Sequence, residues 1–575
     1  MKFHSIGQLG RGLILLLLCV APAAGAQAPA PGPRLVVVIA IDQFRPDYLQ
    51  RFRRYFSPGG FNLLLGRGAT FVEAHYQHGV TQTCPGHAVI LTGSSANVNG
   101  ITANYWFNLA QRREEYCAAD SAATLIGTAG EGRSPRNLRD STVGDRLKQA
   151  TGGRSRVVTV AGKDRSAIML GGHLADAAYW SEDTLIVTSS YYMKELPAWV
   201  QRFNRSRAIS RYRGSTWSHL LPAAAYRLVG RDNVAAEENP GGMGRTFPHR
   251  LSAGRTSLGN FIKGFEASPF ENEMLVRFAM ELVQQEQLGR DDDPDLLAIG
   301  FSANDAVGHS YGPDSHEVMD MTVRTDRELA RLFGFLDRQI GMDRVLVVLT
   351  ADHGVAPLPE VVRQRNPAVQ AARINPAIIA SAAEEALRVR YGEPRAPAWM
   401  TPPAWIMYPK WPWMHLNLPG LEDRGIPVEE AERIAQEAIR SMPGVAQVLT
   451  GTELRESRRT GAHSRAELSF DPERSGQLYY AFSPYLVPGP DADGTDHGSP
   501  WTYDTHVPLL WFGPGIAPGV HQDPVSVGDI APTLSALLGL DPPGGSQGRV
   551  LREMLLPGGL DNHGDALTDP NAHGR

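Results

Sequence analysis

Five short runs of apolar residues, rich in β-branched side chains, indicate a layered α/β protein. The runs cover residues 35–41, 157–160, 296–299, 345–349 and 507–512. Their apolar residues are continuous rather than alternating, which is typical of strands that are covered on both faces in a mostly parallel sheet. Helical periodicity lies between them, for example over residues 272–285 and 529–538. The pattern therefore predicts an α/β fold with a mostly parallel central sheet flanked by helices.

Two long stretches interrupt this alternation. Residues 171–290 are rich in loops, and residues 361–480 contain a Pro- and Trp-rich run (399–413) and an amphipathic helix (428–439). We interpret both as insertions that cap the active-site face; the alternative is loop padding on the rim of the sheet. The catalytic core then consists of residues 34–170, 291–360 and 481–557, followed by a tail, residues 558–575, that we expect to be disordered.

Residues 1–26 have the pattern of an export signal. Lys2 and Arg11 supply positive charge, residues 13–20 are apolar, and Ala24, Gly25 and Ala26 are small enough for a cleavage site. The apolar stretch is shorter than the roughly 20 residues that a membrane-spanning helix needs. We therefore expect cleavage near Ala26, no stable membrane anchor, and a periplasmic or secreted mature protein.

Charge excludes one broad class of partner. The 575-residue chain has a formal net charge of -5 and no long run of Lys and Arg. Because binding to nucleic acid needs clustered positive charge, nucleic acid is not an expected partner.

Two cysteines, Cys84 and Cys117, remain after cleavage of the expected signal. In an oxidising compartment they are able to form one disulfide. The alternative is a pair of buried free thiols.

Three aspartates and three histidines at predicted strand ends or in loops form a candidate metal-binding set. They are Asp42, Asp305, His309, Asp352, His353 and His497. The spacing of Asp305 and His309 places both on one face of a helix, within reach of one ion. Adjacent side chains such as Asp352 and His353 diverge and can serve two ions. Imidazole with carboxylate suits Zn²⁺, so the set indicates two zinc ions, although any one of these histidines alone is more often structural.

Four further residues are candidates for the nucleophile and for binding of phosphate oxygens, roles that metal ions alone do not fill. Thr83 precedes a predicted helix with Pro85 near its start, where a hydroxyl feels the positive end of the helix dipole and, beside zinc, can be deprotonated near neutral pH. Alone, such a threonine is more often a cap. Lys163 and Arg165 follow a predicted strand and are able to hold phosphate oxygens, although a Lys-x-Arg pair alone is more often solvated surface. Asn104 completes this group.

This ordered series of residues resembles the alkaline phosphatase superfamily, and more closely its bacterial PafA-type zinc phosphomonoesterases with a threonine nucleophile. The series is Asp42, Thr83, Asn104, Lys163, Arg165, Asp305, His309, Asp352, His353 and His497. The segment 528–534 is also similar to the last helix of this superfamily, and the resemblance covers residues 34–555.

The resemblance implies a role for each residue. One zinc ion would be held by Asp305, His309 and His497, and the other by Asp42, Asp352 and His353, with Thr83 completing it as the nucleophile. Asn104, Lys163 and Arg165 would bind the phosphoryl oxygens. His506 competes with His497 as the last ligand, and we prefer His497 because its His-Gly-Ser loop before the final strand matches the family pattern. His87 and His316 are placed behind the ligands or at the surface.

The resemblance further implies an alkaline phosphatase that hydrolyses phosphate monoesters through a phospho-threonine intermediate, as a monomer with two Zn²⁺ per chain. A phosphodiesterase or nucleotide pyrophosphatase on the same scaffold is the first alternative, because those enzymes share the metal ligands, the threonine and the asparagine. A periplasmic zinc- or phosphate-binding protein without catalysis is the second. A sulfatase is disfavoured, because Cys84-Pro85-Gly86-His87 lacks the context that converts cysteine to an aldehyde.

Overall fold

The computed structural model describes residues 32–251, 257–394, 403–460, 464–489 and 493–557. The predicted signal at residues 1–26 and the predicted tail at residues 558–575 lie outside these ranges. Within them, no helix combines the length and the apolar character that crossing a membrane requires.

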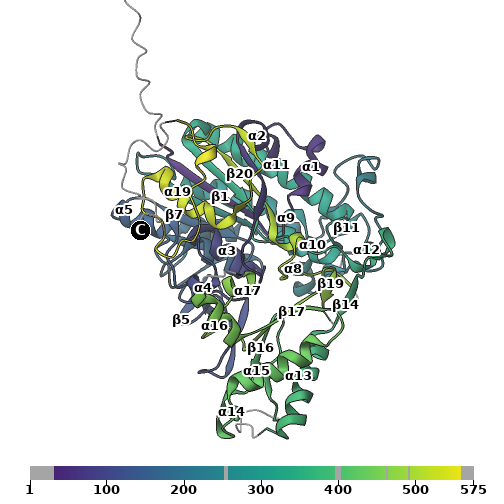
Figure 1. The fold of residues 1–575 in the computed structure, drawn as a ribbon. Helices are drawn as coiled ribbons and strands as arrows, with labels where there is room; N and C mark the ends of the chain where they lie inside the picture. Colours follow the sequence, from purple (N-terminus) through teal and green to yellow (C-terminus); the bar gives the residue numbers. More distant parts are fainter. Residues whose placement is uncertain (1–31, 252–256, 395–402, 461–463, 490–492, 558–575) are drawn as a thin grey trace, which may run out of the picture.

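A twelve-stranded sheet forms the centre of the molecule (Figure 1). In its middle, β13 (Val345–Thr350), β1 (Leu35–Ile41), β12 (Asp295–Phe301) and β7 (Val157–Ala161) are parallel neighbours in that order. Every residue of these four strands is buried. Burial on both faces explains the continuous apolar runs in the sequence. The fifth predicted strand, β20 (His506–Phe512), lies beside β13 and runs antiparallel to it. The predicted fold class is thereby confirmed.

Two groups of helices flank this sheet. One contains α9 (Pro269–Gln285), α10 (Ala303–Tyr311) and α11 (His316–Gln339), which pack against one another. The other contains α3 (Thr83–Thr92), α5 (Val143–Ala150), α6 (Asp164–Gly171) and α19 (Ile530–Leu538). Apolar side chains from both groups join those of the strands in one large core.

The first predicted insertion, residues 171–290, is partly core rather than cap. β8 (Ala177–Glu182) pairs in parallel with β7, and β9 (Leu185–Ser189) pairs antiparallel with β8, so the central sheet continues into this segment. At its other end, α9 packs on β7 and β12. The boundaries differ from the prediction because both ends of the segment bury apolar side chains against the sheet. Between them, the short strands β10 (Thr216–Trp217) and β11 (His249–Arg250) pair within a loop-rich region.

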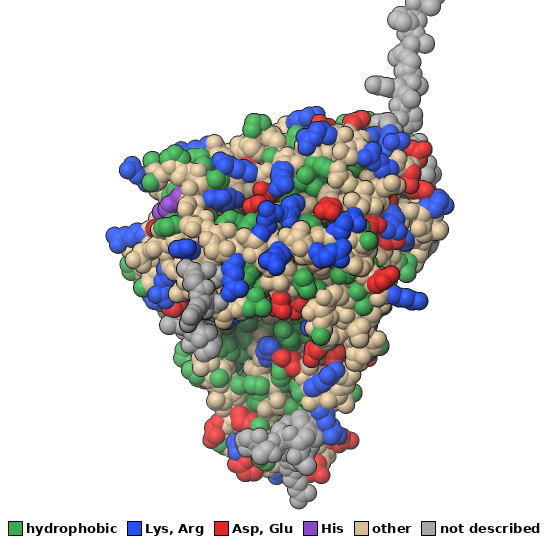
Figure 2. Space-filling model, turned by 180° about the vertical axis from the view of Figure 1, so that it is seen from behind, with side chains coloured by type: hydrophobic (Ala, Val, Ile, Leu, Met, Phe, Trp, Pro, Cys, Tyr) green, Lys and Arg blue, Asp and Glu red, His purple; other side chains and the backbone are tan. Residues whose placement is uncertain are grey.

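The second predicted insertion, residues 361–480, has a core of its own. Its strands β15 (Ile406–Tyr408), β16 (Trp413–Leu416), β18 (Leu478–Phe482) and β17 (Val445–Thr450) form a four-stranded sheet in that order. Helices α13 (Pro376–Tyr391) and α15 (Val428–Arg440) share a separate apolar cluster with this sheet. The unit forms the end of the molecule that narrows in Figures 1 and 2. Figure 2 also shows Lys and Arg side chains interspersed with Asp and Glu on that face.

Candidate active site

Polar side chains follow four neighbouring strands of the central sheet. Asp42 comes directly after β1, Lys163 lies two residues after β7, and Asp352 lies two residues after β13. Asp305 is in the first turn of α10, just beyond β12. Because parallel strands direct their carboxyl ends to the same edge, these side chains meet there. Lys163 Nζ lies 2.6 Å from Asp42 Oδ2 and 2.5 Å from Asp305 Oδ2.

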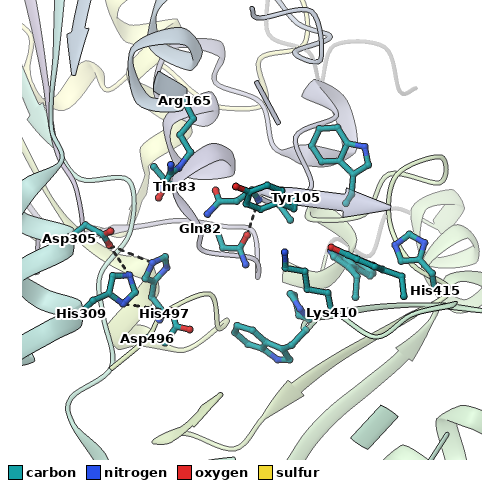
Figure 3. A pocket seen from close by; sticks show the side chains of 17 residues that line it. Gln82, Thr83, Tyr105, Arg165, Asp305, His309, Lys410, His415, Asp496 and His497 are labelled. Carbon is teal, nitrogen blue, oxygen red and sulfur yellow. Dashed lines mark hydrogen bonds and ion pairs between the residues drawn. The ribbon is translucent and has the colours of Figure 1, made fainter. Parts of the chain in front are cut away.

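Asp305, His309 and His497 form the first group of potential metal ligands (Figure 3). Asp305 Oδ1 lies 3.2 Å from His309 Nε2 and 3.6 Å from His497 Nε2. The Nδ1 atoms of the two histidines lie 2.7 Å from the carbonyl oxygens of Thr495 and Thr81, respectively. Since a carbonyl only accepts hydrogen bonds, each Nδ1 carries a proton, and a neutral ring then offers the Nε2 lone pair to the shared centre.

Asp42, Asp352 and His353 lie together as the second group. His353 Nε2 is 3.4 Å from Asp42 Oδ1 and 3.4 Å from Asp352 Oδ2. The ring of His353 stacks on that of His497 with centroids 3.6 Å apart, which brings the two groups side by side. Ligand atoms of Asp42, Asp305 and His353 also fall within 4.8 Å of one another. Asp305 therefore stands between the two groups, which the sequence did not indicate.

These side chains fit a pair of metal ions. Asp42 Oδ1 and His353 Nε2 are buried and have no hydrogen-bond partner among the described residues. Burial and the neighbouring Asp352 raise the pKa of Asp42 well above its ordinary value. Burial disfavours a charged His309, yet Asp305 raises the pKa of this imidazole to about 10. The cluster thus draws in positive charge, and its carboxylate and imidazole donors are those that Zn²⁺ accepts.

Thr83 is the first residue of α3 and is buried at the edge of the same site. It lines a cavity of about 330 Å³ together with Asn104 and Arg165 and with the first ligand group. In Figure 3, Thr83 and Arg165 lie close together on one side of this cavity. The backbone N–H of Cys84 donates to Asn104 Oδ1 at 2.8 Å, so the Asn104 side chain is fixed against the start of the helix.

Lys163 is placed differently from Arg165. Its ammonium contacts the Asp42 and Asp305 carboxylates, and it is not among the residues that line the cavity. Although burial opposes the charge, these two carboxylates raise the pKa of Lys163 above its ordinary value. In this structure Lys163 thus supplies positive charge to the carboxylates, whereas Arg165 lines the space for a substrate.

Two residues behind the ligands hold the carboxylates in place. Gln43 Nε2 donates to Asp305 Oδ1 at 2.8 Å, and its backbone N–H donates to Asp352 Oδ1 at 3.1 Å. His87 Nδ1 lies 3.1 Å from Asp352 Oδ2, in agreement with its expected place behind the ligands. The sequence analysis missed Gln43; its position directly after Asp42 was the available signal. Its φ of 62°, unusual for a residue other than glycine, turns the chain so that it reaches both carboxylates.

Substitution of Gly308 tests whether Gln43 holds the Asp305 carboxylate in place. A Cβ at Gly308 in α10 would overlap the Gln43 side-chain amide that holds Asp305. We expect Gly308→Ala to lower kcat/KM for a phosphate ester by about 10- to 100-fold, the usual effect of losing such a supporting contact. The melting temperature should not fall correspondingly, because alanine favours a helix over glycine by about 0.5–1 kcal/mol. Gly334→Ala in α11, where the nearest atom is 3.5 Å away at the end of Arg338, is the matched control. Full activity of Gly308→Ala would contradict the supporting role of Gln43.

A disulfide joins Cys84 to Cys117. Cys84 follows Thr83, and the backbone N–H of Cys117 donates to the carbonyl of Asn104 at 3.0 Å. Of the two alternatives for these cysteines, the structure has the pair, and the bond ties the Thr83 segment to the Asn104 segment.

His506, the competitor of His497, lies away from both groups. It is the first residue of β20, and its Nε2 lies 2.8 Å from the carbonyl oxygen of Val72. Its ring stacks on that of His75, with centroids 4.5 Å apart. The geometry therefore favours His497 over His506 as a ligand.

The second insertion borders the cavity opposite Thr83 (Figure 3). The lining residues from this unit are Tyr408, Lys410, Trp411, Pro412, Trp413 and His415. Part of the Pro- and Trp-rich run therefore faces the space in which a substrate would lie.

Comparison with known proteins identifies relatives over most of the chain. Residues 36–500 match the family model for type I phosphodiesterase / nucleotide pyrophosphatase. The alkaline phosphatase PafA of Elizabethkingia meningoseptica is 32% identical over 540 residues, which cover 91% of this chain and 94% of PafA. The alkaline phosphatase PhoV of Synechococcus elongatus is 32% identical over 543 residues, 91% of this chain and 93% of PhoV.

A solved structure agrees with these relatives. The crystal structure of wild-type PafA superposes with a TM-score of 0.84 at 31% identity and covers 92% of this chain and 99% of that one. The residues matched by the family model include both ligand groups and Thr83. The chain belongs to the type I phosphodiesterase/nucleotide pyrophosphatase family and, within the alkaline phosphatase superfamily, to its PafA-type members.

Proposed function

We propose that this protein is a zinc-dependent alkaline phosphatase that hydrolyses phosphate monoesters through a phospho-threonine intermediate. The observation that carries the proposal is the position of Thr83, a buried hydroxyl at the start of α3 in the same cavity as Asp305, His309 and His497. The names of the relatives PafA and PhoV support phosphatase activity.

Two zinc ions would be held by the two ligand groups, one by Asp305, His309 and His497 and the other by Asp42, Asp352 and His353. Bound zinc supplies positive charge to the oxygens that become negative during phosphoryl transfer and lowers the pKa of a hydroxyl beside it. The buried ligand atoms without hydrogen bonds support this assignment.

Thr83 would carry the covalent step. Its Oγ attacks phosphorus as the ester oxygen departs, and a water molecule then breaks the threonine–phosphate bond, which restores Thr83 and releases inorganic phosphate. The N-terminus of α3 favours the negative charge that gathers there. Asn104 accepts from Cys84 with its carbonyl oxygen, so its NH₂ group is available to a phosphoryl oxygen.

Arg165 would bind the phosphoryl oxygens that remain. It lines the cavity, and its buried Nε has no hydrogen-bond partner among the described residues. The carboxylate of the adjacent Asp164 is instead bound by Arg133 at 2.8 Å and by the Tyr116 hydroxyl at 2.6 Å. A guanidinium in a cavity with an unused donor suits an anion with several oxygens.

The test compares kcat/KM for p-nitrophenyl phosphate with that for bis-p-nitrophenyl phosphate on zinc-loaded protein. A large preference for the monoester is expected. A preference for the diester would instead support the phosphodiesterase or nucleotide pyrophosphatase alternative, which the family description favours. If the protein binds phosphate but hydrolyses neither ester, the result would instead support a zinc- or phosphate-binding protein without catalysis.

Removal of metal gives a direct prediction. Treatment with a chelator should abolish hydrolysis of p-nitrophenyl phosphate, and added Zn²⁺ should restore it, because the clustered carboxylates and imidazoles then regain their cations. Ca²⁺, which prefers all-oxygen sites, should not substitute. Activity and far-ultraviolet circular dichroism are measured together, so that loss of the fold is distinguished from loss of the metal. Undiminished activity in metal-free protein would exclude the metal role.

Export to the periplasm or the medium is part of the proposal. The disulfide between Cys84 and Cys117 supports it, since such bonds persist in oxidising compartments.

A further inference from the structure

A second cluster of two histidines and an aspartate lies outside the active site, where the loop-rich part of the first insertion meets α11. His219 follows β10, Asp232 belongs to the loop after it, and His316 is the first residue of α11. Their potential ligand atoms all fall within 4.8 Å of one another. All three side chains are half-buried, which leaves the cluster open to an ion from solvent.

The spacing of these atoms matches that of the first active-site group. His219 Nε2 lies 3.1 Å from His316 Nδ1, and His316 Nδ1 lies 3.6 Å from Asp232 Oδ1. In the active site, Asp305 lies 3.2 Å and 3.6 Å from its two histidine nitrogens. A tetrahedral zinc ion with bonds of about 2.1 Å holds its ligand atoms about 3.4 Å apart.

Orientation of the rings also favours a cation at the centre. His316 Nε2 lies 3.2 Å from the carbonyl oxygen of Gly230, so Nε2 carries the proton and Nδ1 presents its lone pair to His219 and Asp232. The His219 ring is packed on Phe247 and Tyr226, with centroids 4.0 and 4.2 Å away. A lone pair and a carboxylate oxygen that face each other repel unless a positive charge lies between them, which either a metal ion or a second proton on His316 supplies. Asp232 Oδ1 also accepts from the Phe247 N–H at 3.4 Å, which fixes this carboxylate beside the two rings.

We propose that His219, Asp232 and His316 bind a structural zinc ion, with water in the fourth position. Two imidazoles and one carboxylate suit Zn²⁺ better than Ca²⁺ or Mg²⁺, whose ligands are mainly oxygen. The competing arrangement is a simple hydrogen bond from His219 to His316, which needs no metal.

Such an ion would fasten the insertion loop to the elements that carry the active site. Beyond Asp232, the same loop donates from Glu238 N–H to the carbonyl of Ser310 at 2.8 Å, and Ser310 belongs to α10. Between these two positions, the carbonyl oxygen of Ala236 accepts from the N–H of Gly494 at 2.7 Å, and Gly494 lies three residues before His497. The zinc would therefore brace both the helix with Asp305 and His309 and the loop with His497.

The test measures zinc per chain by mass spectrometry after saturation and removal of excess metal. The wild type is expected to retain one equivalent more than His316→Asn, and zinc should raise the melting temperature of the wild type more than that of the variant. Asp232→Asn, a change in a half-exposed loop residue, should also weaken retention of this equivalent. His173→Asn is the matched control, because His173 belongs neither to the two active-site ligand groups nor to the proposed site.

Equal zinc content in the wild type and the two variants would overturn the proposal and leave the hydrogen bond between the histidines. The result is independent of the proposed phosphatase activity, because zinc content and melting temperature are measured without substrate. Should His316→Asn fail to fold, the comparison of Asp232→Asn with His173→Asn decides in the same way.

Discussion

Replacement of Thr83 by alanine is expected to lower kcat for p-nitrophenyl phosphate by a factor on the order of 10⁴ or more, the scale seen when a covalent nucleophile is removed. Thr83 is the buried hydroxyl at the start of α3 in the cavity, and its loss leaves no side-chain oxygen to form the covalent bond. The zinc content should be largely preserved, because the aspartates and histidines of the ligand groups remain. Activity is measured under steady-state conditions, and zinc is measured on the same sample.

Thr83→Ser is the matched control. Serine keeps the hydroxyl and removes only a methyl group, so it should retain far more activity than alanine. In a rapid quench with radiolabelled phosphate ester, the wild type and Thr83→Ser should yield acid-stable phosphoprotein, and Thr83→Ala should yield none. Unchanged turnover of Thr83→Ala would remove Thr83 from the mechanism and leave direct attack by water.

The central sheet could be predicted because its signal is local. Each of the four parallel strands is an uninterrupted apolar run, since both of its faces are buried. The small sheet of the second insertion was not predicted. Its strands β15 and β16 have only three and four residues, and the apolar run of β18 was not recognised as a strand. The extension of the central sheet into the first insertion was also missed, because β8 and β9 lie next to a long loop-rich stretch and were assigned to the insertion with it.

The candidate site, too, could be predicted only in part from the sequence. Residue types and strand ends were sufficient to select Asp42, Asp305 and Asp352, because the fold class directs those ends to one edge. The sequence could not show that Asp305 stands between the two groups, or that Lys163 contacts carboxylates rather than the cavity. Those facts depend on side-chain directions set by tertiary packing, as does the support from Gln43.

The combined substitution Lys163→Ala/Arg165→Ala should lower kcat/KM for p-nitrophenyl phosphate by a factor on the order of 10³, because it removes both the cation that lines the cavity and the cation that offsets the charge of Asp42 and Asp305. A monoester is a dianion near neutral pH, whereas a diester carries a single charge. Hydrolysis of bis-p-nitrophenyl phosphate should therefore change much less. The ratio of the two kcat/KM values, measured on zinc-loaded wild type and variant, should collapse.

Single substitutions separate the two cations. Arg165 lines the cavity with an unused Nε donor, so Arg165→Ala should account for most of the effect on the monoester. Arg165→Lys keeps the charge but loses the two-pronged guanidinium, so it should recover activity only in part. Lys163 contacts Asp42 and Asp305, so Lys163→Ala should also alter zinc retention, which Arg165→Ala should leave unchanged. If the ratio survives all of these changes, the choice between monoester and diester does not depend on the two cations. The side chains of the second insertion that line the cavity, Tyr408, Lys410, Trp411, Trp413 and His415, would then be the next residues to replace.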